Sequence, residues 1–107
     1  MVIRGGENIY PREIEEFLYG HPDVQEVQAF GVPDARYGEE LCVWVVPRPG
    51  AELNEALIRA YCQGKIAHYK VPRYVRIKGQ LPMTVTGKAQ KFVMRDEMLK
   101  DLGLTTG

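Results

Sequence analysis

The alternation of apolar and polar residues predicts a short amphipathic helix near the start of the chain. Ile14, Phe17 and Leu18 recur at helical spacing, and charged residues fall between them on the opposite face. Pro11 suits the first helical position because its missing N–H is not needed there. The helix is therefore expected to begin at Pro11 and to end at Gly20, a residue that commonly stops helices.

Apolar runs predict the strands. Residues 41–46 are continuously apolar, which is typical of a strand buried on both faces and hence of a central strand. Residues 24–32 predict a second strand, followed by a turn at 33–34 and a solvated loop over 34–40. Residues 74–78 alternate, as an edge or half-exposed strand does.

Two further helices follow from the same reasoning. Asn54 is a suitable N-cap for the second, because its side chain can accept a hydrogen bond from the first turn. One face of that helix is expected to carry Leu57, Ile58, Tyr61 and Cys62. The third helix ends at Gly103, and its apolar positions are Phe92, Val93, Met98, Leu99 and Leu102.

The chain begins with a short strand over residues 2–4, after which Gly5 and Gly6 force a turn. The whole order predicts an α+β domain with a small β-sheet covered by three helices and preceded by this Gly-turn β-hairpin. A length of 107 residues fits one domain. No apolar run approaches the roughly 20 residues of an integral membrane segment, so we expect a cytoplasmic protein.

The charge is divided unevenly between the two halves. Residues 1–53 contain four Lys/Arg and ten Asp/Glu, a net charge of −6, and residues 54–107 contain the reverse, a net charge of +6. A nucleic-acid binder is usually basic overall, so the even total disfavours that class. A small phosphorylated ligand, or an acidic surface elsewhere in the same polypeptide, fits the basic half better.

Common catalytic and metal motifs are missing from the sequence. Cys42 and Cys62 stand apart within apolar patterns and are expected to be reduced core residues. His21 and His68 have no second ligand at metal spacing, so no metal site is expected. No nucleophile stands beside a histidine in a recognisable arrangement, which indicates that this domain lacks its own hydrolytic machinery.

The candidate chemistry lies in the segment LPMTVTGKAQKFVMR, where Lys88 directly follows Gly87. A lone Gly-Lys is usually a solvated lysine in a turn. A phosphate-binding P-loop is excluded because Pro82 occupies the position of its first glycine and Ala89 that of its Ser/Thr. A lysine held by a loop just before a helix could still deliver one positive charge to an anionic reacting group.

Four segments of the sequence, taken in order, favour a functional role for this lysine over that of an ordinary turn residue. IRGGENIYPREIEEFLYGHPDV, FGVPDARYGEELCVWVV, HYKVP and LPMTVTGKAQKFVMR together resemble the C-terminal domain of the adenylate-forming acyl-CoA synthetases. This superfamily is shared with luciferases and peptide-synthetase adenylation domains. The RGGENIYP wording is most similar to medium- or long-chain fatty acyl-CoA synthetases.

The resemblance implies a two-step ligase reaction with MgATP and coenzyme A as co-substrates. A carboxylate attacks the α-phosphate of ATP to give an acyl-adenylate and pyrophosphate, and the coenzyme A thiol then displaces AMP. The resemblance also implies that the ATP and acyl pockets belong to a much larger N-terminal domain. Residues 1–107 would be the mobile C-terminal lid that presents a different face for each step, inactive alone.

The resemblance assigns roles residue by residue. Lys88 matches the family's catalytic lysine. The loop around it would be shaped by Pro82, Thr84, Thr86 and Gly87. Residues Gly5, Gly6 and Glu7 match a loop that forms part of the pantetheine tunnel, and Gly38 and Glu39 match a loop that faces the same site. No residue for the coenzyme A phosphates is carried over from the family, because these contacts vary within it. The basic half of the chain offers Lys65, His68, Lys70, Arg73 and Lys91, of which Lys70 is the preferred candidate.

Two alternatives stay open. The chain could belong to a peptide-synthetase adenylation domain, in which a carrier-protein phosphopantetheine replaces coenzyme A. It could also be a binding module that uses the same fold without catalysis. For each assigned residue, ordinary turn or surface chemistry is the competing interpretation.

Overall fold

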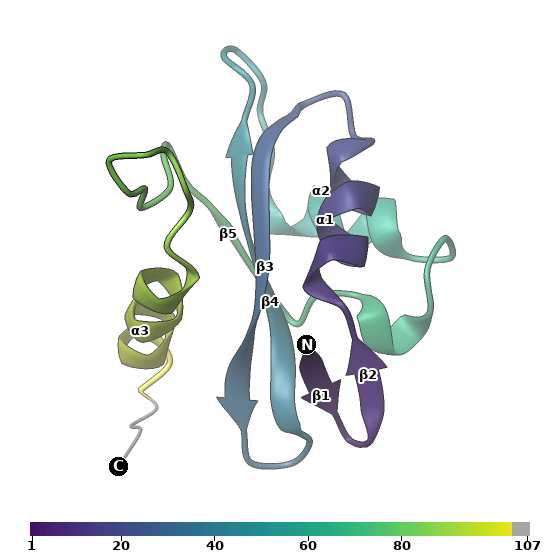
Figure 1. Ribbon diagram of the computed structural model, residues 1–107. Coiled ribbons are helices and arrows are strands. Elements are labelled where there is room, and N and C mark those ends of the chain that lie inside the picture. The colour runs from purple at the N-terminus through teal and green to yellow at the C-terminus, as the bar shows by residue number, and fades with distance from the viewer. Residues whose placement is uncertain (104–107) are drawn as a thin grey trace.

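Residues 1–103 are described by a computed structural model of the chain (Figure 1). The elements in chain order are β1 (Val2–Arg4), β2 (Glu7–Ile9), α1 (Pro11–Tyr19), β3 (Val24–Asp34), β4 (Gly38–Pro47), α2 (Glu55–Cys62), the 3₁₀ helix η1 (His68–Lys70), β5 (Tyr74–Ile77) and α3 (Lys91–Asp101). Strands β1 and β2 form a separate hairpin, and the larger sheet has the order β3-β4-β5. The predicted α+β class, with a small sheet, three helices and a glycine hairpin, is confirmed.

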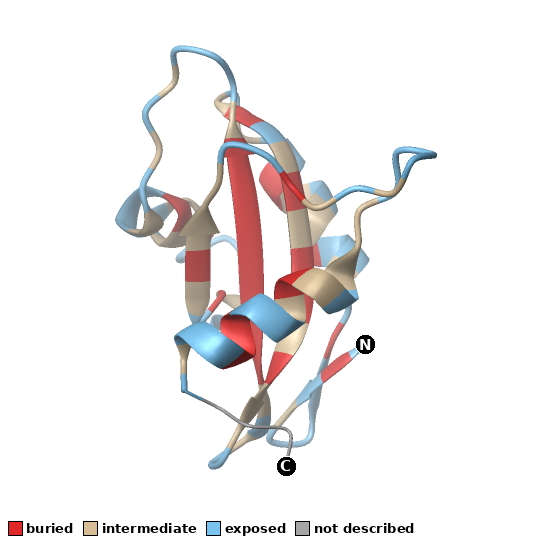
Figure 2. Ribbon diagram, turned by 90° about the vertical axis from the view of Figure 1, so that its left-hand side faces the viewer, coloured by how far each residue is buried: buried red, intermediate tan, exposed pale blue. Residues whose placement is uncertain are grey.

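Strand β4 is the central strand, as its continuous apolar run predicted. It pairs antiparallel with β3 and parallel with β5, and it is buried along most of its length (Figure 2). Helices α1 and α2 cover one face of the sheet and α3 covers the other (Figure 1). Both faces of β4 are therefore removed from water, which explains why its apolar residues do not alternate with polar ones.

Successive side chains of β4 enter two different apolar clusters, because side chains alternate across a strand. The cluster beneath α1 and α2 receives Leu41, Val43 and Val45. The cluster beneath α3 receives Cys42, Trp44 and Val46. The protein thus has two cores on opposite faces of the sheet, and any shift of the central strand β4 would disturb both.

Helix α1 has the predicted bounds, but Gly20 ends it for another reason than expected. Its φ of −70° is right-handed, so no left-handed cap is formed. A Cβ at this position would lie 3.1 Å from both the Phe17 carbonyl oxygen and the Tyr61 hydroxyl. Glycine is favoured here because a Cβ would crowd the Phe17 carbonyl and the Tyr61 hydroxyl of α2.

The turn predicted at Pro33 and Asp34 was wrong. Strand β3 continues to Asp34, which pairs with Gly38, and the reversal is made by residues 35–37. The Asp34 carboxylate accepts hydrogen bonds from the backbone N–H groups of Arg36 and Tyr37, at 2.9 and 2.8 Å. An aspartate that bonds the backbone two and three residues later favours such a tight turn, so the predicted solvated loop is a hairpin.

Two predicted core residues are also wrong, although their helices exist. Leu57 is 48% exposed and Phe92 is 66% exposed. In α3 the residues that pack beneath the sheet are Met94, Met98 and Leu99. The prediction placed Phe92 on the buried face of the helix. In the structure the buried face is the one that packs with Trp44, and its first residue is Met94.

A carboxylate fastens the β1–β2 hairpin to the larger sheet. Glu39 Oε1 accepts a hydrogen bond of 3.0 Å from the N–H of Ile3. The same side chain lies over Gly31, where a Cβ would stand 2.4 Å from Glu39 Oε2 and 3.1 Å from Val2 Cγ2. Because Gly31 has no side chain, the Glu39 carboxylate and Val2 of the hairpin can pack against the sheet at this point.

Gly31→Ala should lower the free energy of unfolding by about 1–2 kcal/mol, because the added methyl group displaces the Glu39 carboxylate from its bond to Ile3. Urea denaturation measures the effect. Gly79→Ala is the matched control, since no atom lies within 4 Å of the Cβ position of Gly79. Equal unfolding midpoints for the two variants would contradict this account of the hairpin contact.

Candidate functional site

Lys88 lies in the loop that joins β5 to α3 and projects from the body of the domain (Figure 1). The loop is closed at its base by a bond of 2.9 Å from Gln90 N to the Pro82 carbonyl oxygen. Thr84 makes reciprocal bonds with Lys88: its N–H donates to the Lys88 carbonyl at 2.8 Å, and its Oγ1 accepts from Lys88 N at 3.0 Å. The backbone of Lys88 is thus held in a defined position.

The tip of the loop is a tight turn. The N–H of Gly87 donates to the Thr84 carbonyl at 2.9 Å, and the φ of Gly87 is +84°, a conformation that side-chain-bearing residues rarely adopt. The hydroxyls of Thr84 and Thr86 lie 3.0 Å apart and share a hydrogen bond. Each of the four residues expected to shape the loop therefore has a local structural contact or conformation.

The side chain of Lys88 is exposed. Within residues 1–103, no carboxylate lies within ion-pair distance of its ammonium. The same loop and the start of α3 also carry exposed apolar side chains, those of Met83, Val85 and Phe92. The charge of Lys88 is therefore available to a group that lies outside this domain.

The second candidate site is the turn of the β1–β2 hairpin. Gly5 and Gly6 have φ values of +55° and +89°, so both require glycine for their backbone conformation. Gly5 lies against Tyr37: its N–H donates to the Tyr37 carbonyl at 2.8 Å, and a Cβ on Gly5 would stand 3.0 Å from the tyrosine ring. A Cβ on Gly6 would meet nothing within 4 Å, so the surface beside Gly6 is open.

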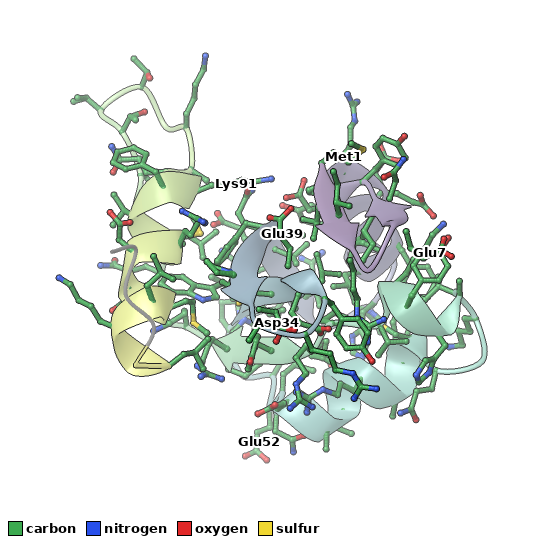
Figure 3. The ribbon with its side chains drawn as sticks, turned by 90° about the horizontal axis from the view of Figure 1, so that it is seen from below. Met1, Glu7, Asp34, Glu39, Glu52 and Lys91 are labelled. Atoms are coloured by element: carbon green, nitrogen blue, oxygen red, sulfur yellow. The ribbon has the colours of Figure 1, made fainter. Side chains whose placement is uncertain are left out.

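The turn at residues 35–37 is the neighbour of this glycine turn. Figure 3 shows the two from below, with Glu7 on the hairpin and Asp34 and Glu39 on the β3–β4 side. Glu7 is exposed, and its backbone pairs with that of Arg4. Gly38, with a φ of +84°, begins β4. The structure therefore brings all five residues of the predicted tunnel loops to one end of the domain.

Arg4 and Tyr37 belong to this site, although neither was singled out from the sequence. The guanidinium of Arg4 bonds to the carboxylate of Glu40 at 2.6 Å, and Glu40 is only 4% exposed. The guanidinium carbon of Arg4 lies 4.0 Å from the centre of the Tyr37 ring, and that of Arg36 lies 5.0 Å from it. This stacking of cations on the ring holds Tyr37 beside Gly5.

Two shallow pockets adjoin these residues, with volumes of about 280 and 230 Å³. Both are lined by Arg4, Glu40 and Arg73. The first also includes Asp34, Arg36 and Tyr37; the second also includes Arg59, Gln63, His68, Val71 and Pro72. Arginines outnumber carboxylates in this lining, so the pockets suit an anionic group such as a phosphate.

The other predicted cations are engaged elsewhere. Lys70 Nζ bonds to Glu13 at 2.7 Å, and this hydrogen bond raises the pKa of the Lys70 ammonium. Lys91 Nζ bonds to Glu15 at 2.8 Å, and Lys65 lies 4.2 Å above the Tyr61 ring. Of the five cations considered from the sequence, only His68 and Arg73 line the pockets.

The cysteines offer no chemistry in the folded chain. Burial raises the pKa of the Cys42 thiol to about 12 and that of the Cys62 thiol to about 11, so both are protonated at neutral pH. Thiols in this state are poor nucleophiles. Across the described residues, no cluster of three metal-ligating side chains occurs, and no helix is long and apolar enough to cross a bilayer.

Comparison with known proteins gives consistent matches. Residues 13–88 match the family model described as AMP-binding enzyme C-terminal domain. YngI of Bacillus subtilis is 51% identical over 99% of this chain and 19% of its own length. The mitochondrial medium-chain acyl-CoA ligase ACSF2 of Danio rerio is 53% identical over 97% of this chain and 17% of its own length.

A solved structure extends the match to three dimensions. The fatty acyl CoA synthetase of Mycobacterium tuberculosis superposes with a TM-score of 0.85 and 40% identity, over 94% of this chain and 20% of that structure. The chain therefore spans about a fifth of the length of the relatives it matches.

Proposed function

This chain belongs to the AMP-binding enzyme C-terminal domain family, and on that premise we propose that it is the lid domain of an ATP-dependent acyl-CoA synthetase. Its substrates would be ATP, a carboxylic acid and coenzyme A, with the ATP and acyl pockets on a larger N-terminal domain. Relatives named as medium-chain and fatty acyl enzymes favour a fatty acid as the carboxylate. The cytoplasmic location expected from the sequence stays a prediction.

The observation that carries this proposal is the position of Lys88. Its backbone is held by Thr84, and its exposed ammonium has no acidic partner in residues 1–103. In adenylation a carboxylate must approach a phosphate, and the two anions repel each other. An ammonium placed between them offsets this repulsion and stabilises the charge that develops in the transition state.

The glycine turn supports a role in the second half-reaction. The open surface beside Gly6 could admit the thin pantetheine arm, and the ring of Tyr37 beside Gly5 would form one wall of its path. Gly38 and Glu39 would hold the adjoining wall, since Glu39 bonds to the hairpin at Ile3. The thiol would then reach the acyl-adenylate on the larger domain.

The arginine-lined pockets adjoin this path and could bind the phosphates of coenzyme A. Arg73 lines both pockets, and Arg36 lines the first, with its guanidinium carbon 5.0 Å from the centre of the Tyr37 ring. Guanidinium groups bind phosphates through paired hydrogen bonds, which makes them suited to this task. Lys70 stays a candidate, although it would have to leave Glu13 or share it.

The two proposed surfaces lie far apart on the domain. In Figure 1 the Lys88 loop and the tip of the β1–β2 hairpin project from opposite sides. Both cannot face one acyl-adenylate at the same time, so the domain would turn between the two half-reactions.

Lys88→Ala in the complete enzyme should slow adenylation by roughly 10²–10³, the scale for removing one preorganised charge partner from a transition state. Carboxylate-dependent exchange between ATP and pyrophosphate measures this step. Thioester formation from supplied acyl-adenylate should be spared. Lys100→Ala, an exposed lysine on α3, is the control. Equal losses in both half-reactions for Lys88→Ala would overturn its assignment to one surface.

Gly6→Leu should impair thioester formation and leave the ATP–pyrophosphate exchange largely intact, because the new side chain would occupy the proposed pantetheine path. Gly50→Leu is a matched control. Gly50 has a φ of +83° and an equally open Cβ position, but it lies in the loop between β4 and α2. Both variants carry the same backbone strain, so similar thioester rates would refute the tunnel role.

Arg73→Gln should raise the KM for coenzyme A by about tenfold or more, the scale for losing one charged hydrogen bond, without slowing adenylation. Dephospho-coenzyme A, which lacks the 3′-phosphate, shows which phosphate Arg73 binds. If Arg73 binds the 3′-phosphate, the variant and the parent should have similar KM values for this analogue. Lys70→Gln tests the other candidate. Lys100→Gln is the control, because Lys100 is exposed on α3 and lines neither pocket. An unchanged KM for Arg73→Gln would remove this residue from the site.

A further inference from the structure

Glu15 connects three elements through one carboxylate. Its Oε2 accepts a hydrogen bond of 2.8 Å from the backbone N–H of Ala29 in β3. The same oxygen lies 2.8 Å from Nζ of Lys91, the first residue of α3. Glu15 is on α1, and its side chain is 16% exposed, whereas that of Lys91 is 40% exposed, so the carboxylate is the shielded partner of this contact.

The geometry follows from the place of β3 at the edge of the sheet. An edge strand has outward N–H groups without a neighbouring strand, and the Glu15 carboxylate satisfies the one at Ala29. Because that bond fixes the carboxylate at the sheet edge, a side chain from the other face can reach it. Lys91 does so, and Figure 3 shows its side chain pointing from α3 toward the body of the domain.

Lys91 directly follows the base of the loop that carries Lys88. The base is closed between Gln90 and Pro82, and only Ala89 and Gln90 separate the two lysines in the chain. A displacement of Lys91 would therefore move the loop base. The internal bonds of the loop fix its shape, whereas the contact with Glu15 fixes its orientation relative to α1 and the sheet.

From this arrangement we infer that Glu15 and Lys91 are positioning residues for Lys88. The inference rests on the proposed function for its catalytic consequence. Neither residue touches the reacting groups. Their ion pair holds the loop so that the Lys88 ammonium reaches its target in one orientation, which is the kind of alignment on which rates depend steeply.

Glu15→Gln isolates the ion pair, because the glutamine oxygen can still accept the hydrogen bond from Ala29. In the complete enzyme, Glu15→Gln and Lys91→Met should each lower kcat for adenylation by about tenfold, less than the roughly 10²-fold cost of a 1 Å misplacement. The KM for ATP and the rate of thioester formation from supplied acyl-adenylate should stay within about twofold of the parent.

Conservative and matched variants separate positioning from general stability. Lys91→Arg keeps the charge and should restore kcat. The double variant Glu15→Gln/Lys91→Met should lose no more than either single variant, since both remove the same pair. Glu16→Gln removes a carboxylate one residue away, from an exposed pair with Arg12, and should behave as the parent. A similar loss in both half-reactions, or no rescue by Lys91→Arg, would overturn the inference.

A measurement on the 107-residue chain separates this inference from the proposed function. Backbone ¹⁵N relaxation should give order parameters near 0.85 for Thr84 and Lys88 in the parent, falling toward about 0.6 in Glu15→Gln, while β4 stays unchanged. Unchanged values in the loop would refute the link. If the parent enzyme made no acyl-adenylate, the proposed function would fail, but the relaxation data would still decide whether the pair holds the loop.

Discussion

The burial of β4 on both faces is the constraint on which the rest of the structure depends. Alternate side chains of this strand, such as Val43 and Trp44, enter cores on opposite sides of the sheet. Close-packed cores resist deformation, so elements on the two faces cannot slide past each other without a cost to both. The glycine hairpin adds Val2 and Ile9 to one core, and α3 adds Met94 and Met98 to the other. The proposed presentation of two surfaces in turn requires that their relative positions stay fixed.

The uneven charge of the two halves acts within the domain as well as at its surface. Two acidic residues of α1, Glu13 and Glu15, pair with Lys70 and Lys91 from the basic half. The 3₁₀ helix η1, which contains Lys70, and the start of α3, which contains Lys91, are thus both held against α1. What remains for a ligand is the arginine-lined end of the domain, where Arg4 comes from the acidic half. A cationic surface for a phosphorylated ligand stays a prediction, and two of the lysines proposed for it, Lys70 and Lys91, pair with glutamates of α1.

Local patterns predicted most elements, because their determinants are close in sequence. The bounds of α1, the central strand and the Asn54 cap all follow from neighbouring residues, and Asn54 does accept a bond from Leu57. The errors arose where tertiary contacts decide. Space beside Gly20 is limited by Tyr61, which is 41 residues later in the chain, and the buried face of α3 is the one that packs with Trp44. Neither partner can be read from a helical repeat.

The candidate site divides in the same way. Lys88 and the pair Gly5 and Gly6 could be proposed from the sequence because each lies in a segment whose residues are consecutive in the chain. Glu40 was missed because its partner, Arg4, is 36 residues away, and Glu15 was missed because its two partners come from β3 and α3. A helix glutamate facing solvent and a helix glutamate that caps a strand edge look alike in a sequence. Only the fold distinguishes Glu15 from Glu16.

The exposure of Lys88 gives a physical reason why this domain would need its larger partner. Its backbone is ordered by the loop, but a solvated lysine side chain retains about 2 kcal/mol of rotamer entropy, and water screens its charge. In the proposed reaction, docking on the larger domain would confine the side chain to one conformation. It would also exclude the water that screens the charge. The domain itself would supply the order that a rotation leaves unchanged: the hydrogen-bonded Lys88 loop and the contact between Glu15 and Lys91 at the start of α3.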